Sequence, residues 1–529
     1  MLFTSYGFIG FAAVLVSAYY LVPKRCQWGL LLAASYLFYF IAGPSALLYL
    51  LATTAAVWFA ALQIEKNVRR QSAYLKARKD ILSKDEKKEY KAEQKRVRAR
   101  WVAACLLLSI GILAVVKYTN FFISNVNGVL DALDRPQLSF VTLALPMGIS
   151  FYTFQAVGYL IDVYRGKYPA EKNPFRFALF VSFFPLLVQG PISRFDELGG
   201  TLYQEHTFDK VTVCSGLQRV LWGYFKKMVI ADRMLAAVST IIGHTDTYTG
   251  AYVFVGMIFY TLELYADFTG GIDITIGLAE AMGITVQENF RRPYFSKSLK
   301  EYWRRWHISM CSWFREYLFY PVSTSRAMQR FSKFARGRLG EAVGRRLPVY
   351  ISSFIVWFAT GIWHGASWNF IVWGLLNWAV LMLSEELEPL YQRFHDRFPV
   401  NGRGAYKLFQ TGRTFLLVCV LNIFDCYPSL SVTAGALGSM FTVRNWSVLW
   451  DGSLMALGLS GLDYGILAAG LLLMLGVSLA QRSGSVREKI RTLRYPARFA
   501  IWYGLFLAVL LMGAYGIGYD ASQFIYNQF

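Results

Sequence analysis

The chain has 529 residues, of which 55% are hydrophobic, 17% aromatic and only 16% charged. Soluble domains carry about a quarter charged residues, and the apolar residues here come in long blocks, so the composition excludes one large soluble core. The formal net charge is +21, and the Lys and Arg residues lie between those blocks, as in the cytoplasmic loops of membrane proteins. The charge therefore indicates a protein of the lipid bilayer and no nucleic-acid partner.

The first part of the chain predicts three membrane spans and a basic helical insertion. The spans are expected at Tyr6–Val22, Gln27–Ile41 and Ser45–Leu62. Lys24 and Arg25 separate the first two, and basic loops stay in the cytoplasm, so we expect the N-terminus to face outward. The third span then reaches the cytoplasm at residues 64–100, which lack Pro and Gly and are rich in Lys and Arg. We predict a cytoplasmic helix there, either a solvated hairpin or a surface for a partner.

The middle of the chain predicts five further spans with unusual polar and helix-breaking residues. They are expected at Trp101–Val116, Phe140–Val163, Phe175–Leu187, Gln218–Ile242 and Tyr252–Ile276. The unusual residues within them are Pro146, Gly148, Pro185, Lys226, Lys227 and Asp232. Such residues are tolerated at membrane depth only where they face protein or a water-filled cavity. We therefore expect this region to enclose something polar.

An amphipathic helix is predicted over Ser298–Val322. Its apolar residues recur at alternating steps of four and three, which places them on one helical face: Leu299, Trp303, Trp306, Met310, Trp313 and Tyr317. The charged residues fall largely elsewhere. This pattern is typical of a helix at the membrane interface or packed on a bundle, and not of a span.

Two apolar runs, Val349–Trp363 and Phe370–Ser384, flank His364. The first has 15 residues, about 22 Å as a helix, against a hydrocarbon core of about 30 Å. A chain entering from the basic cytoplasmic loop Arg326–Arg346 therefore reaches His364 before it leaves the membrane. Further spans are expected at Thr414–Phe424, Ile466–Ala480 and Phe499–Ile517, with an outward C-terminus.

These elements predict an all-α fold. It is a polytopic transmembrane bundle of about eleven spans, with an amphipathic interfacial helix and the basic cytoplasmic extension. Each span needs about 20 mostly apolar residues. We expect residues 1–529 to form a single transmembrane domain that includes the insertion at 64–100.

Two of the five histidines, His307 and His364, are the candidate catalytic residues. Both have aromatic neighbours, whereas His206, His244 and His395 lie in polar loops. An ionisable side chain inside a membrane indicates function, although a histidine that only hydrogen-bonds between helices gives the same pattern. A neutral imidazole can take a proton from a hydroxyl, which then attacks a thioester. The sequence has no G-x-S-x-G elbow and no His or Cys pair at metal-ligand spacing, so we expect neither a serine hydrolase nor a metal site.

Five further residues are candidate substrate-binding residues: Asn289, Arg304, Arg305, Trp363 and Asp267. The cations around the amphipathic helix are Arg291, Arg292, Lys297, Lys300, Arg304 and Arg305. Such cations could receive the phosphates of a nucleotide-bearing donor, and anchoring to anionic lipid headgroups is an equal alternative. Asp267 lies on a predicted span beside two adjacent glycines, where a packing or hinge role is the alternative to chemistry.

Eight strings spread over most of the chain carry a family resemblance. They are Leu145–Gln155 (LPMGISFYTFQ), Gly190–Arg194 (GPISR), Phe225–Asp232 (FKKMVIAD), Ala266–Gly270 (ADFTG), Glu288–Tyr294 (ENFRRPY), Tyr302–Ser309 (YWRRWHIS), Trp363–Trp368 (WHGASW) and Gln523–Phe529 (QFIYNQF). In this order they resemble the membrane-bound O-acyltransferase family, and specifically its bacterial alginate O-acetylation branch. Two departures are a Thr where the family often has Asp-Phe-Ser-Gly, and the long basic extension.

The resemblance implies a helical bundle with a thinned centre and an outer funnel. It implies that the chain is an O-acyltransferase of a bacterial cytoplasmic membrane, with an acetyl group moving from acetyl-CoA or another acyl thioester to a cell-surface or secreted polysaccharide. The family's essential histidine maps onto His364, and its second motif histidine onto His307. The thioester is a donor substrate, and we expect no bound cofactor.

Several partners and alternatives follow from the same resemblance. An extracytoplasmic accessory protein is expected to relay the acetyl group to the polysaccharide. Within the family, D-alanyl transfer to teichoic acid from a carrier-protein thioester is the alternative. A polysaccharide-precursor transporter is the alternative from another class, and it predicts inverted repeats, which the sequence lacks.

Overall fold

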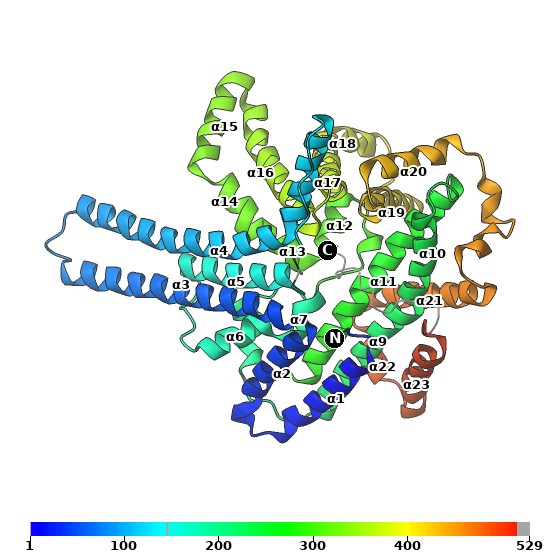
Figure 1. Ribbon diagram of the computed structural model, residues 1–529, viewed down its shortest axis with the longest axis horizontal. Helices are drawn as coiled ribbons and strands as arrows, with labels where there is room; N and C mark the ends of the chain where they lie inside the picture. The colour runs from blue at the N-terminus through cyan, green and yellow to red at the C-terminus, as the bar shows by residue number, and fades with distance from the viewer. Residues whose placement is uncertain (1, 144–145, 516–529) are drawn as a thin grey trace. The chain divides into compact units, whose positions relative to one another are not determined.

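Helices make up the regular structure of this protein in the computed structural model, which describes residues 2–143 and 146–515. Within those ranges there is no β-strand, which confirms the predicted all-α class. The motif at Gln523–Phe529, and the predicted C-terminal orientation, fall outside the described residues. Figure 1 gives the order of the elements.

Seven of the described helices are long and apolar enough to cross a membrane. They are Ala46–Ala77, Lys84–Ala132, Ala251–Ala281, Glu341–His364, Gly404–Cys426, Gly461–Ser483 and Tyr495–Met512. An eighth candidate is the pair Trp368–Glu386 and Glu388–Arg397, bent by 48°. The apolar helices Tyr6–Leu21 and Leu430–Thr442 are shorter. This is a multi-pass membrane protein, and the total of about eleven spans stays a prediction.

The chain divides into two compact units. The first comprises Met1–Val213 and Leu278–Gln287, and the second comprises Cys214–Gly277 and Glu288–Phe529. The helices that begin in the first unit are α1 (Tyr6–Leu21), α2 (Gln27–Ala42), α3 (Pro44–Ala77), α4 (Lys84–Ala132), α5 (Ile149–Arg165), α6 (Pro174–Ser182), α7 (Phe184–Gln189), α8 (Phe195–Leu202) and α9 (Lys210–Tyr224). Its core is aromatic, with Phe8, Phe38 and Phe184 packed ring against ring.

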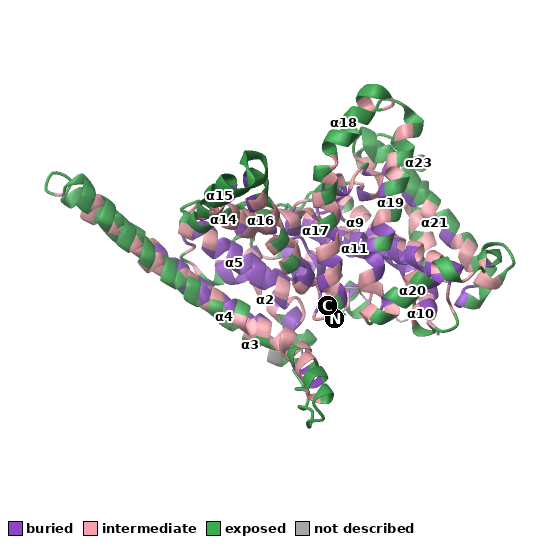
Figure 2. Cartoon of the chain, turned by 90° about the horizontal axis from the view of Figure 1, so that it is seen from above, coloured by how far each residue is buried: buried purple, intermediate pink, exposed green. Residues whose placement is uncertain are grey.

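The basic insertion is a helical hairpin, as the sequence predicts. It is formed by the ends of α3 and α4, which lie side by side (Figure 1) and are largely exposed there (Figure 2). Asn67 donates to Gln94 across the pair at 2.7 Å, and the rings of Tyr74 and Tyr90 lie 4.3 Å apart. Ser83 begins α4 with a reciprocal capping box, which satisfies two N–H groups at the helix start.

The predicted span Phe140–Val163 is helical only from Ile149 onward. Two asparagines of α4 explain the difference, because each makes two hydrogen bonds to the main chain of the segment between α4 and α5. Asn120 binds Val141 in both directions at 2.9 Å, and Asn127 binds Leu138 at 2.7 and 2.9 Å. These bonds hold 138–141 in an extended conformation along α4. The predicted span Phe175–Leu187 also breaks, between α6 and α7. Pro185 lies in the first turn of α7, a position that proline favours.

The second unit carries the remaining helices. They are α10 (Asp232–Gly243), α11 (Ala251–Ala281), α12 (Leu299–Arg305), α13 (Ile308–Phe314), α14 (Tyr320–Ser323), α15 (Arg326–Leu339), α16 (Glu341–His364), α17 (Trp368–Glu386), α18 (Glu388–Arg397), α19 (Gly404–Cys426), α20 (Leu430–Thr442), α21 (Gly461–Ala480), α22 (Val486–Arg491) and α23 (Tyr495–Met512). Two π-helical stretches, Phe225–Ala231 and Arg315–Phe319, lie between them.

A buried ion cluster joins the π-helical stretch to α10 and α11. The ammonium of Lys227, whose side chain is 0% exposed, lies 2.7 Å from both Asp232 and Asp267. A charge is taken out of water at a large cost unless opposite charges meet it there. The lysine that looks anomalous in an apolar stretch is therefore compensated within the protein.

Replacing Lys227 with Met should destabilise the fold, because two buried carboxylates would lose their shared cation. The expected loss is about 3–5 kcal/mol, the usual cost of breaking a buried ion pair. Thermal unfolding in detergent measures it. Lys210→Met, at an exposed position of α9, is the matched control, and an unchanged midpoint in Lys227→Met would contradict the role of the cluster.

Candidate active site

His307 lies in a break between two short helices. The helix predicted over Ser298–Val322 is interrupted at Trp306 and His307, because another segment pairs with it at this point. Arg291 N–H donates to the Arg305 carbonyl at 2.9 Å, and Ile308 N–H donates to the Asn289 carbonyl at 3.0 Å. His307 adopts a left-handed conformation with φ 45°, which is uncommon for a residue with a side chain.

Aromatic rings surround His307, whose side chain is fully buried. The ring centroid of Phe268 is 4.9 Å away, that of Trp363 5.9 Å and that of Phe290 6.5 Å. Burial lowers the pKa of His307 well below its usual value, and the charge of nearby His364 would lower it further. His307 is thus held as a neutral imidazole, the form that accepts a proton.

His364 is the last residue of α16 and is partly buried. Its ring centroid lies 4.7 Å from that of Trp373, 5.0 Å from Trp363 and 6.3 Å from Phe370. Trp363 is therefore the ring that His307 and His364 share. The structure brings together three residues that the sequence singled out separately.

Close packing of α16 against α17 places His364. A Cβ added at Gly374 would lie 2.5 Å from the Trp357 carbonyl, and one added at Gly361 would lie 2.5 Å from the Phe370 carbonyl. Such glycines let two membrane helices approach closely. The helix pair can therefore turn within a few residues of His364 and present it beside Trp373.

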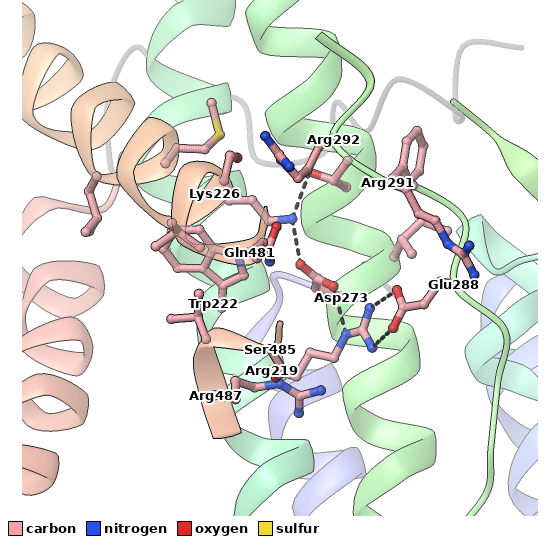
Figure 3. A pocket seen from close by; sticks show the side chains of 18 of the residues that line it. Arg219, Trp222, Lys226, Asp273, Glu288, Arg291, Arg292, Gln481, Ser485 and Arg487 are labelled. Carbon is pink, nitrogen blue, oxygen red and sulfur yellow. Dashed lines mark hydrogen bonds and ion pairs between the residues drawn. The ribbon is translucent and has the colours of Figure 1, made fainter. Parts of the chain in front are cut away.

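A cavity of about 1230 Å³ lies in the second unit, between α9, α11, α21, α22 and α23. Arg304 and Arg305 line it, together with Arg219, Arg291, Arg292 and Arg487. Figure 3 shows Lys226 facing Asp273, and Arg219 bridging Asp273 and Glu288. These two cations are neutralised by carboxylates within the cavity wall.

Arg292 is less well neutralised than these two cations, and its neighbour Arg305 pairs with Glu301 in a partly exposed bridge. Partial burial lowers the pKa of the Arg292 guanidinium, and the charges of Arg305 and Arg482 lower it further. The Nε of Arg292 is buried and has no hydrogen-bond partner among the described residues. Guanidinium groups that repel one another favour an anion between them, and phosphates fit their geometry.

The rest of the cavity wall is apolar. Leu473, Met474 and Val477 come from α21, and Ile501 and Leu505 come from α23. Phe290 lines the cavity on one side and packs near the His307 ring on the other. The basic cavity therefore ends at the wall of the histidine site.

The remaining predicted site residues have partners of their own. Asp267 binds Lys227, and the Oδ1 of Asn289 accepts hydrogen bonds from Ser309. Of the other predicted cations, Lys300 pairs with Glu385 outside the cavity. No sequence pattern indicated that α21, α22 and α23 complete the cavity, because these helices lie far along the chain from Glu288 and resemble ordinary span and loop.

Comparison with known proteins identifies the family of the chain. Residues 169–337 match the model of the membrane-bound O-acyltransferase family. The chain is 32% identical to the Azotobacter vinelandii protein named "Probable alginate O-acetylase AlgI", over 85% of this chain and 79% of that protein. The chain belongs to the membrane-bound O-acyltransferase family.

Two more distant relatives widen the range of activities within the family. The peptidoglycan O-acetyltransferase of Helicobacter pylori is 29% identical over 56% of this chain and 58% of its own length. The teichoic acid D-alanyltransferase of Bacillus subtilis is 27% identical over 48% and 62%. The protein is accordingly an O-acyltransferase. The region that matches the family model contains His307 but ends before His364.

Gly374→Ala should separate α16 from α17 and displace His364. A displacement of about 1 Å at a reacting group can cost about 100-fold in rate, so we expect acyl transfer to fall about 10- to 100-fold. Thermal unfolding checks that the variant is folded. Gly435→Ala, where an added Cβ meets nothing within 4 Å, is the control, and equal activity of the two variants would contradict the packing argument.

Proposed function

We propose that this O-acyltransferase moves an acyl group, an acetyl group in the first instance, from a cytoplasmic thioester across the membrane. The final acceptor is a hydroxyl of a cell-surface or secreted polysaccharide, reached through an extracytoplasmic accessory protein that relays the acetyl group. The relation to an alginate O-acetylase over most of both chains supports the acetyl donor. The protein lies in a bacterial cytoplasmic membrane with both termini outward.

The observation that carries this proposal is the meeting of His307 and His364 on one tryptophan ring. The Trp363 centroid is 5.9 Å from that of His307 and 5.0 Å from that of His364. Two imidazoles in an aromatic, water-poor setting are suited to proton transfer at neutral pH. A histidine that only joined helices would not explain why a second one is held in a strained conformation beside it.

The chemistry follows from these two residues. His364 takes the proton of the acceptor hydroxyl, and the oxygen attacks the carbonyl carbon of the thioester. The tetrahedral intermediate then breaks its C–S bond, and the leaving thiolate receives the proton from the His364 imidazolium. The product is an O-acyl ester, and the donor leaves as a free thiol. His307 and Trp363 line the reacting groups.

The basic cavity is the donor site in this proposal. Arg292, Arg304 and Arg305 meet the phosphates of CoA, and its pantetheine arm runs along Phe290 toward His307. The carboxylate-paired cations Arg219 and Lys226 form the wall and not the binding group. An anionic lipid headgroup has the same chemistry at this cluster and is the alternative occupant.

A carrier-protein thioester is the second donor candidate. The relation to a teichoic acid D-alanyltransferase supports it, since a phosphopantetheine arm carries one phosphate and the same thioester. Transport of a polysaccharide precursor is set aside, because an O-acyltransferase accounts for the buried histidines.

His364→Ala should abolish transfer and leave the fold intact. Purified protein in detergent receives labelled acetyl-CoA and D-alanyl carrier protein in separate reactions, and thioester consumption is followed. His395→Ala, at a surface histidine that contacts Tyr406, should keep wild-type turnover. Acetyl-CoA turnover that survives in His364→Ala would sink the assignment, and turnover with the carrier alone would move the protein to D-alanyl transfer.

Arg292→Gln should raise the donor KM and leave kcat unchanged, because it removes a cation that meets a phosphate far from the reacting carbonyl. A hydrogen bond to a charged group contributes about 1.5–3 kcal/mol, so KM should rise about 10- to 100-fold. The exposed Arg338→Gln on α15 is the matched control. A donor KM equal to that of wild type would remove Arg292 from the donor site.

A further inference from the structure

Asn289 accepts three hydrogen bonds from the turn that carries His307. Its side chain is 0% exposed. The Oδ1 accepts hydrogen bonds from the Ser309 main-chain N–H and from the Ser309 hydroxyl, both at 3.0 Å. The Asn289 carbonyl accepts from the Ile308 N–H, also at 3.0 Å.

These bonds replace a missing helix cap. The first N–H groups of a helix have no partner within it, and the side chain of the N-cap residue usually supplies one. The N-cap of α13 is His307, which makes no such bond from its side chain. Asn289, some twenty positions earlier in the chain, accepts from the first two N–H groups instead. The imidazole of His307 is thereby kept out of capping and packs beside Trp363.

The segment that carries Asn289 also touches the basic cavity. Glu288 forms a two-bond ion pair with Arg219 at 2.6 Å per bond, which fixes one end of the segment to α9. Arg291 and Arg292 follow Asn289 and line the cavity. One short stretch of chain therefore has donor-facing cations on one side and the His307 turn on the other.

We propose that Asn289 is a positioning residue that holds His307 in its reactive orientation through Ser309 and Ile308. This inference rests on the proposed function for its kinetic consequence, but its structural consequence does not. Asn289 acts as a hydrogen-bond acceptor through Oδ1 and touches neither donor nor acceptor. Loss of its side chain removes both bonds to Ser309 and leaves the turn held by main-chain bonds alone. His307 then leaves its place beside Trp363.

The test compares Asn289→Ala with Asn289→Asp, which keeps an oxygen in the place of Oδ1. Asn289→Ala should lower kcat about 10- to 100-fold, the scale of a misplaced reacting group, with the donor KM unchanged. Asn289→Asp should recover most of that rate. Asn401→Ala, at an exposed loop position, controls for the substitution, and thermal unfolding verifies that each variant is folded.

A second readout needs no acyl transfer. Diethyl pyrocarbonate modifies accessible imidazoles, and mass spectrometry locates the modified residue. His307 should be protected in wild type and in Asn289→Asp and become modified in Asn289→Ala, while His395 reacts equally in all three. This readout still decides the position of His307 if neither thioester is turned over, an outcome that would refute the proposed function instead.

Two results would overturn the inference. Asn289→Ala with wild-type kcat and a protected His307 would show that the turn holds without Asn289. Equal loss of kcat in Asn289→Ala and Asn289→Asp, with His307 protected in both, would mean that the amide N–H of Asn289 contacts the substrate directly.

Discussion

A charge buried in an apolar helical bundle must meet an opposite charge inside the protein, and this constraint separates structure from function here. Lys227 satisfies it completely, between Asp232 and Asp267. Arg219 and Lys226 satisfy it through Asp273 and Glu288. The charges of the paired cations are therefore compensated within the second unit, and these cations offer no free positive charge to a ligand.

Arg292 breaks the pattern, and for that reason we place the proposed donor site there. Its guanidinium lies near two other arginines and has a buried Nε without a hydrogen-bond partner among the described residues. A phosphate would supply the missing negative charge. The same cavity has an apolar wall and ends at Phe290, so it suits a molecule with a phosphate end and a long uncharged arm. Acyl-CoA and phosphopantetheine both have that shape.

Much of the fold could be predicted from the sequence, and what could not has a physical explanation. Apolar blocks predicted the all-α membrane class, and the run of Lys and Arg predicted the hairpin of α3 and α4. Helical periodicity failed at Trp306 and His307, because the break comes from pairing with Asn289 and Arg291, which no local pattern records. The prediction of a membrane span from apolar residues failed before Ile149, where Asn120 and Asn127 hydrogen-bond the main chain of residues 138 and 141. Tertiary hydrogen bonds outweighed local preference in both places.

The candidate site was predicted unevenly for the same reason. His307 and His364 stood out because an ionisable side chain among aromatic residues at membrane depth is costly. The structure brings both of them to the ring of Trp363. Arg304 and Arg305 belong to the cations that the sequence analysis grouped around one helix, and both line the cavity. Asp267 and Asn289 stood out for the same polarity, yet their bonds go to Lys227 and Ser309. Polarity in an apolar stretch therefore identifies a constrained residue, and only its partners tell what the constraint serves.

The proposed function requires the donor's phosphates to lie at the arginine cluster and its carbonyl at the two histidines. The most direct measurement is an experimental structure of the protein with acetonyl-CoA, an analogue that has a methylene between sulfur and carbonyl and cannot transfer its acyl group. We expect phosphate density beside Arg292 and Arg305, and the ketone within hydrogen-bonding reach of His364 or His307. A lipid headgroup at the arginines, with the analogue bound elsewhere, would contradict it.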